Sequence, residues 1–230
     1  MSARSADVTG ARVVRSFDCE AVLFDMDGTL IDSRIVVERG WRQWAARHGL
    51  DPAAVVVAAQ GRRTEDTVRR FCPEGVDPQA EIRALLAAEE ADVEGIVALA
   101  GASSLLAQLP PGRWAVVTSA HAALARNRIA AARLPIPRVL VTAEDVVRGK
   151  PDPEGFQRAA AQLGFAPHRC LAFEDAPAGV VAAQAAGATV VIVTGAQHLA
   201  QPPQGTHLRD YRDIRVSPGE CGMTLTLCGP

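Results

Sequence analysis

The sequence predicts an α/β fold, a Rossmann-like doubly wound parallel sheet that carries a small inserted α-helical cap domain. Short apolar runs without alternation recur along the chain, as in strands that are buried on both faces of a parallel sheet. Ala-rich segments suited to helices separate the later runs. About 80 residues of helical pattern separate the first run from the second, which indicates an insertion between two strands of one sheet.

The elements follow in this order. A polar segment over 1–17 is expected to be a flexible tail. The core is expected over 18–33 and 102–216, and the cap over 34–101, with hinges near Ser33 and Gly101. The segment over 217–230 has no usable pattern and is treated as a second tail. Strands are predicted over 21–24, 114–118, 138–142, 170–173 and 188–193, core helices over 121–133, 153–163 and 177–186, and cap helices over 34–49, 64–71 and 78–96.

Composition limits the possible partners and compartments. The chain has 230 residues, a net charge of −2 and 4% aromatic residues, which disfavours nucleic-acid binding. No run approaches the ~20 apolar residues of a membrane span, and no signal-peptide pattern is visible. Five cysteines without a C-x-x-C pair indicate reduced thiols. We therefore expect a cytoplasmic monomer or weak homodimer that binds neither nucleic acid nor membrane.

The first strand runs into two aspartates. Ligands of a parallel sheet bind beyond the carboxyl ends of its strands, which is where Asp25 and Asp27 lie. Residues i and i+2 of an extended segment project to the same side, so the two carboxylates are expected to converge. That arrangement is costly unless a cation or a proton lies between them. Gly28 permits a turn whose amides can face an anion. The alternative is a pair of loop or helix-cap aspartates.

Two further strand ends carry polar groups. Thr118, Ser119 and Ala120 offer a hydroxyl and two amides at the start of a helix, which suits an anion, although an ordinary helix N-cap has the same pattern. Glu174 and Asp175 form a second acidic pair at a strand end, and the alternative is again helix capping. Together with the first pair they supply four carboxylates at neighbouring strand ends, a donor set that suits Mg²⁺.

Lys150 stands out by residue type. Of the 24 basic residues 23 are arginine, and Lys150 is the sole lysine. A compact ammonium differs chemically from a guanidinium fork, so this position is predicted to need the ammonium. Chance is the alternative reading.

These motifs resemble those of the haloacid dehalogenase-like superfamily of phosphohydrolases. The resemblance rests on "DMDGT", a strand ending in Thr-Ser, "GKPDPEGF" and "FEDAPAGVVAAQAAGA", in that order, and spans residues 20–215. The insert resembles the cap of that family. More loosely, "GRRTEDTVRRF" and "EEADVEGI" resemble the phosphatases of sugar and polyol phosphates, such as those acting on 2-deoxyglucose 6-phosphate or glycerol 3-phosphate.

The resemblance implies a Mg²⁺-dependent phosphatase that hydrolyses small sugar or polyol phosphate monoesters through an aspartyl phosphate. Asp25 matches the nucleophile and Asp27 the general acid/base. Thr118 matches the phosphate-binding hydroxyl, and Lys150 the charge-neutralising lysine. The metal ligands implied are Asp25, Asp175, Glu174 directly or through water, and the backbone carbonyl of Asp27. Ala176 replaces a serine that is frequent in the family.

Substrate binding is assigned to two groups of residues. The phosphate is expected to contact Gly28, Ser119 and Ala120. Arg62, Arg63 and Thr64 begin a cap helix and are expected to reach a sugar hydroxyl or a phosphate oxygen, unless they form a solvated basic helix start.

Two other functions remain open at this point. The alternative enzyme is a phosphomutase of the β-phosphoglucomutase type, which the Arg-Arg-Thr segment disfavours. A binding protein without enzymatic activity is disfavoured by the intact acidic residues and Lys150. Asp32 and Ser33 either cap the first cap helix or form the hinge.

Overall fold

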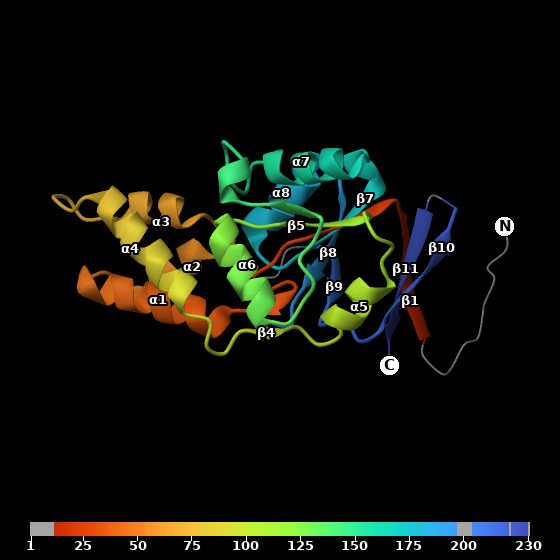
Figure 1. Cartoon of the computed structure of the whole chain (residues 1–230), viewed down its shortest axis with the longest axis horizontal. Coiled ribbons are helices and arrows are strands. Elements are labelled where there is room, and N and C mark those ends of the chain that lie inside the picture. Colours follow the sequence, from red (N-terminus) through yellow and green to blue (C-terminus); the bar gives the residue numbers. More distant parts are fainter. Residues whose placement is uncertain (1–11, 197–203, 221, 230) are drawn as a thin grey trace.

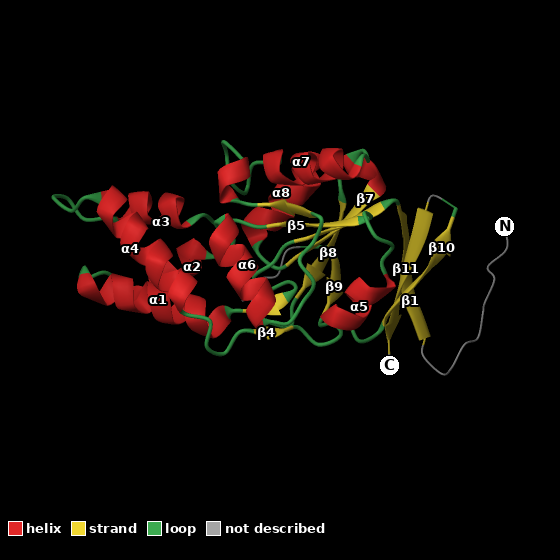
Figure 2. Ribbon diagram, in the orientation of Figure 1, coloured by secondary structure: helices red, strands yellow, loops and turns green. Residues whose placement is uncertain are grey.

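The computed structural model describes residues 12–196, 204–220 and 222–229. Among these residues, six parallel strands form the main sheet in the order β6-β5-β2-β7-β8-β9. Figures 1 and 2 show this sheet in the middle of the molecule. The strands are β2 (Ala21–Phe24), β5 (Trp114–Val117), β6 (Val139–Val141), β7 (Cys170–Glu174), β8 (Thr189–Val193) and β9 (Thr206–Leu208).

Helices cover both faces of the sheet, which confirms the doubly wound α/β fold. Successive residues of β2 enter different cores: Leu23 packs under α7 (Glu154–Leu163) and α8 (Pro177–Ala186), whereas Val22 and Phe24 pack on the side of α5 (Ala102–Gln108) and α6 (Ala122–Ala131). Because both sides of β2 are buried, its sequence has no polar positions to alternate with apolar ones.

The inserted helices pack around an apolar cluster of their own. They are α1 (Arg34–Arg47), α2 (Pro52–Ala59), α3 (Thr64–Phe71) and α4 (Pro78–Ala91), and Figure 1 shows them at one end of the molecule. Trp41 and Trp44 lie edge to face in this cluster, with ring centroids 5.7 Å apart. We refer to α1–α4 as the cap.

Two details of the cap differ from the prediction. No helix is predicted over 52–59, yet α2 forms there, because the Asp51 side chain accepts the Ala53 N–H and Pro52 occupies the first turn. The last cap helix is shorter than predicted and ends at Ala91, before Asp92, whose side chain instead pairs with Arg39.

The two connections between core and cap run side by side. Strand β3 (Ile31–Asp32) pairs with β4 (Val97–Ala98) in an antiparallel two-stranded ribbon. Ser33 stands at the N-cap position of α1, but its side chain makes no capping hydrogen bond.

The two ends of the chain form a sheet that the sequence does not predict. Strand β1 (Arg12–Cys19) pairs antiparallel with β11 (Gly222–Gly229), which pairs with β10 (Ile214–Gly219). The expectation of tails is therefore wrong for residues 12–17 and for most of 217–230, while residues 1–11, 221 and 230 lie outside the described ones. The side chains of Met223, Leu225 and Leu227 are buried in the core beside α5, and this burial stabilises the sheet.

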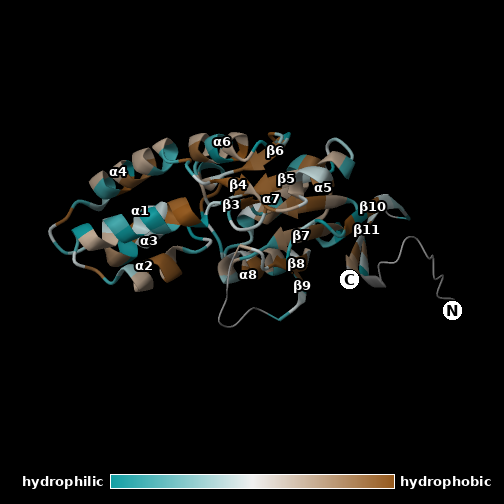
Figure 3. Cartoon of the chain, turned by 90° about the horizontal axis from the view of Figure 1, so that it is seen from below, coloured by the Kyte–Doolittle hydropathy of each residue, from teal (hydrophilic) through white to brown (hydrophobic). Residues whose placement is uncertain are grey.

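Apolar residues concentrate in the main sheet. Figure 3 shows brown strands β5 and β6, whereas α1 and α4 mix teal with brown. In the part of the chain that the structure describes, no helix combines the length and apolar character needed to cross a membrane.

Candidate active site

The candidate site lies at the carboxyl ends of the central strands. Asp25 directly follows β2, and Glu174 and Asp175 lie at the end of the neighbouring β7. The Asp25 N–H donates to the Phe173 carbonyl at 2.9 Å, which fixes the first strand end against the second. Lys150 reaches the same point from the connection between β6 and α7. These four residues are buried, and we call them the carboxylate–lysine cluster.

Lys150 holds the carboxylates of two strands together. Its Nζ lies 2.5 Å from Asp25 Oδ1 and 2.7 Å from Glu174 Oε1. The Lys150 side chain is 5% exposed, so both ion pairs are shielded from water. A flexible stem that ends in a compact ammonium can donate to both acids in this confined space.

The charges of the cluster do not balance. Among the described side chains, it combines three carboxylates with one ammonium. Burial raises the pKa of Asp25 to about 7, against the opposing effect of Lys150. Burial also raises the pKa of Asp175 well above its usual range, and the charges of Glu174 and Asp25 add to that rise. The pKa of Lys150 is raised as well: burial alone would lower it, but Asp25 and Glu174 outweigh that effect, so the ammonium stays charged. The cluster is therefore short of positive charge.

The donor set fits a divalent cation. Asp25, Glu174 and Asp175 can each offer one oxygen within 4.8 Å of the others, and all three are buried. Gly28 lies so close to Asp175 that a Cβ there would lie 2.0 Å from Asp175 Oδ2. The Thr29 hydroxyl donates to Asp175 Oδ1 at 3.3 Å. Hard carboxylate oxygens in this arrangement suit Mg²⁺.

Asp27 lines the same cavity as Asp25 but has different hydrogen-bond partners. Ser33 Oγ donates to Asp27 Oδ1 at 2.5 Å, and Arg128 Nη1 lies 3.0 Å from Asp27 Oδ2. The chain turns after Asp25, where the amide of Leu30 donates to the Met26 carbonyl, and this turn redirects Asp27. The Asp27 carboxylate lies outside the group of acids that could share a cation.

The residues predicted to contact the phosphate line a cavity next to the carboxylate–lysine cluster. A cavity of about 120 Å³ is lined by Asp25, Asp27, Gly28, Thr118, Ser119 and Ala120 from the core. Thr118 is buried and its Oγ1 accepts the Ala120 N–H at 3.1 Å, so its own proton remains for a ligand. The Ser119 hydroxyl donates instead to the carbonyl of Gly61 in the cap, at 3.0 Å.

Of the three cap residues predicted to bind substrate, two line this cavity and one does not. Arg62 and Thr64 line the same cavity as Asp25 and Asp27. Arg63 does not: its Nε lies 2.9 Å from Asp66 Oδ2, and its Nη1 donates to the Val147 carbonyl. Arg63 therefore joins the cap to a core loop and lines a separate, smaller pocket beside Thr118 and Lys150.

The structure adds residues that sequence reasoning missed. Arg128 of α6 is 4% exposed and lines the cavity. Glu89 of α4 also lines the cavity. Arg128 follows the buried Ala125 by three residues and the buried Leu124 by four, which places all three on the same inner face of α6. This spacing was the signal from which the burial of Arg128 could have been predicted. Ser33, whose role remained open, contacts Asp27 and is thus tied to the site.

The chain is similar to known proteins. The family described as haloacid dehalogenase-like hydrolase matches residues 19–187. Hexitol phosphatase A of Escherichia coli is 45% identical over 179 residues, covering 76% of this chain and 83% of the relative. The 2-deoxyglucose-6-phosphate phosphatase 1 of Saccharomyces cerevisiae is 32% identical over 201 residues, covering 77% and 81%. The crystal structure of a hydrolase from Pseudomonas syringae superposes with a TM-score of 0.68 and 28% identity, covering 79% of this chain and 87% of that one.

Proposed function

This chain belongs to the haloacid dehalogenase-like hydrolases and is a phosphoric monoester hydrolase, and from that premise we propose that it hydrolyses small sugar or polyol phosphates with Mg²⁺ through an aspartyl phosphate. The observation that carries the proposal is the buried carboxylate–lysine cluster beside a cavity that also holds Asp27. The names of the two curated relatives support the substrate class.

The first half of the reaction transfers the phosphoryl group to the protein. An oxygen of Asp25 forms a bond to phosphorus while the bond from phosphorus to the alcohol oxygen breaks. Asp27 gives a proton to the departing oxygen, so that a neutral alcohol leaves. Bound Mg²⁺, held by Asp25, Glu174, Asp175 and the Asp27 carbonyl, would supply positive charge between nucleophile and phosphate.

The second half returns the protein to its starting state. Asp27 takes a proton from a water molecule, whose oxygen attacks phosphorus as the bond to Asp25 breaks. Inorganic phosphate leaves, and Asp25 is again a carboxylate. Lys150, 2.5 Å from Asp25, neutralises negative charge in both halves.

The phosphate and leaving group are held by different parts of the chain. The Thr118 hydroxyl and the Ser119 amide bind the phosphoryl oxygens beside Gly28 and Ala120, whose own amides donate to the Ile31 carbonyl and to Thr118 Oγ1. The cap covers the leaving group and excludes water. Both curated relatives described above are named phosphatases, so we retain hydrolysis over the phosphomutase reaction. A cytoplasmic location and a monomer or weak homodimer stay predictions.

The test is phosphate release from a panel of monoesters that contains glucitol 6-phosphate, 2-deoxyglucose 6-phosphate and glycerol 3-phosphate. We expect release from at least one in Mg²⁺, loss of activity with chelator, and no turnover by Asp25→Asn. Release from none of them, or full activity in chelator, contradicts the proposal. With β-glucose 1-phosphate, NMR detection of glucose 6-phosphate would favour the mutase.

A further inference from the structure

The cap side of the cavity presents polar side chains to the leaving group. Thr64 begins α3, Glu89 lies near the end of α4, and Arg128 comes from α6 of the core; all three line the cavity of Asp25 and Asp27. Thr64 Oγ1 donates to Glu89 Oε2 at 3.2 Å. We call these three residues the leaving-group wall. Core and cap thus both contribute to it.

Arg128 supplies a donor that has no partner. Its Nη1 pairs with Asp27 at 3.0 Å, but its Nε is buried without a hydrogen-bond partner among the described residues. The whole side chain is 4% exposed, so bulk water does not solvate this N–H. Buried donors are almost always satisfied in folded proteins, and an exception in a cavity marks a place for a ligand acceptor.

Glu89 supplies an acceptor next to that donor. Burial raises its pKa, while the positive charge of Arg128 and the hydrogen bond from Thr64 oppose the rise. A hydroxyl group both donates and accepts, so neighbouring hydroxyls of a polyol can satisfy Glu89 and Arg128 together. An anionic leaving group would meet the negative charge of Glu89, and an apolar one would leave the Arg128 N–H unpaired.

We propose that Thr64, Glu89 and Arg128 form a hydroxyl-binding site that selects uncharged, polyhydroxylated leaving groups over anionic or apolar ones. The inference rests on the proposed phosphatase function, which it deepens by assigning the substrate preference to these residues. Glu89 and Thr64 act on specificity, whereas Arg128 also holds Asp27.

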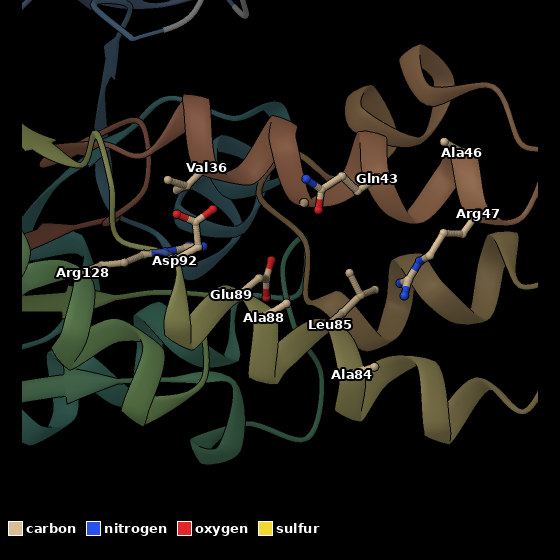
Figure 4. Close-up of a pocket in the computed structure, with 11 residues that line it drawn as sticks. Val36, Gln43, Ala46, Arg47, Ala84, Leu85, Ala88, Glu89, Asp92 and Arg128 are labelled. Atoms are coloured by element: carbon tan, nitrogen blue, oxygen red, sulfur yellow. The ribbon is translucent and has the colours of Figure 1, made fainter.

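Glu89 can be changed without disturbing the cap core. Glu89 and Arg128 also line a second cavity of about 600 Å³ between α1 and α4, which Figure 4 shows with both side chains labelled. Because Glu89 borders this cavity between α1 and α4, its side chain is not closely packed on all sides. It lies outside the apolar cluster around Trp44.

The test compares selectivity between two phosphate monoesters, glucitol 6-phosphate and 4-nitrophenyl phosphate. The variants are Glu89→Leu, Thr64→Val and Thr64→Ser, with Glu90→Leu as the matched control, because Glu90 is the next residue of α4 and lines neither cavity. We expect Glu89→Leu to lower the ratio of kcat/KM values, polyol over nitrophenyl, about 100-fold, mainly through KM. Thr64→Val should lower it about 10-fold, and Thr64→Ser should restore it, since a hydroxyl remains.

The outcomes separate the two proposals. If wild-type enzyme prefers glucitol 6-phosphate and Glu89→Leu keeps the ratio, the hydroxyl-binding site is overturned and the phosphatase stands. An equal fall in Glu90→Leu also overturns it, because any disturbance of α4 would then suffice. If the wild type releases phosphate from neither compound, nor from 2-deoxyglucose 6-phosphate or glycerol 3-phosphate, the phosphatase proposal fails, and this inference fails with it. If it hydrolyses 2-deoxyglucose 6-phosphate or glycerol 3-phosphate but prefers 4-nitrophenyl phosphate to glucitol 6-phosphate, the phosphatase stands and the hydroxyl-binding site is overturned.

Discussion

The carboxylate–lysine cluster and the leaving-group wall are held in different ways. The three acids of the cluster lie at the ends of adjacent strands of one sheet, and the side chains of Asp25, Lys150 and Glu174 are 0 to 8% exposed. The wall is assembled from two cap helices and one core helix, and its hydrogen bonds cross between separate elements. A rigid sheet edge suits groups that must react at fixed distances, whereas a wall across a hinge can close on the substrate.

Contacts at the boundary between cap and core support this distinction. Ser119 donates to the Gly61 carbonyl, and His121 Nε2 lies 2.5 Å from Glu65 Oε1. His121 is also 3.3 Å from Glu144 of the core. These contacts are few and partly exposed, so the cap is expected to open at lower free energy than the sheet unfolds.

The largest expected effect comes from the ammonium of the cluster. Lys150→Arg should lower kcat at least ~10³-fold, because a planar guanidinium cannot replace an Nζ that contacts Asp25 and Glu174 in a buried space. Steady-state phosphate release measures it. Arg148→Lys, whose side chain is 71% exposed, is the control. Near-normal activity of Lys150→Arg would show that the sole lysine stands there by chance.

The second largest effect is expected at Gly28, whose backbone packs against the side chain of Asp175. Gly28→Ala should lower the free energy of unfolding by about 2 to 4 kcal/mol, since φ is +85° and the new Cβ would overlap Asp175. Gly49→Ala is a matched control with φ of +65° and open space around it, and should cost about 1 kcal/mol. Urea denaturation compares the two. Equal losses would mean that the backbone conformation alone, and not Asp175, excludes a side chain.

Metal addition should stabilise the cluster measurably. Mg²⁺ at about 100 times its Kd should raise Tm by about 5 to 10 °C, because binding to the folded state contributes about 2.7 kcal/mol. Asp175→Asn should abolish the shift, whereas Glu220→Gln, an exposed acid in the distant terminal sheet, should retain it. Differential scanning calorimetry gives the result independently of activity. A full shift in Asp175→Asn would place the metal elsewhere.

The smallest effect concerns the boundary between cap and core. Burial alone would lower the pKa of His121, but its hydrogen bonds with Glu65 and Glu144 and their charges raise it overall. A raised folded-state pKa stabilises the protein fully below the unfolded value near 6.5, and the contribution is lost as pH rises through the folded value.

His121→Gln should therefore destabilise the protein by less than about 1 kcal/mol at pH 5.5 and by almost nothing at pH 9. Urea denaturation at the two pH values measures the difference. His168→Gln, at an exposed histidine away from the cap, is the control. If His121→Gln lowered the free energy of unfolding more at pH 9 than at pH 5.5, the raised pKa assigned to His121 would be contradicted.

Much of the fold and of the cluster could be predicted because both depend on local sequence. Unalternating apolar runs predicted five strands of the main sheet, and the carboxyl ends of parallel strands meet at one edge. Asp25, Glu174 and Asp175 were therefore expected to be neighbours before any contact was known. Lys150 was distinguished by residue type alone, and the structure places it against two of them.

The terminal sheet could not be predicted, because its pairing joins residues that are far apart in the chain. Ser16 faces Thr226 across the β1–β11 pair. Residues Met223 to Leu227 alternate between apolar and polar, which was the available signal for a strand, but the pattern does not say which strand it pairs with. Its stability comes from burial of Met223 and Leu225 beside the main sheet, which is a property of the folded chain.

The sequence by itself determined the chemistry of this protein: which acids and which ammonium stand at the ends of the strands, and hence which reaction class they suit. Only the tertiary structure decided which polar groups face the leaving group. Arg62 and Arg63 are adjacent, yet one lines the cavity and the other pairs with Asp66, and Arg128 meets Asp27 across 101 positions. Strand ends follow from backbone periodicity, whereas helix faces are oriented only by the packing of the cap on the core.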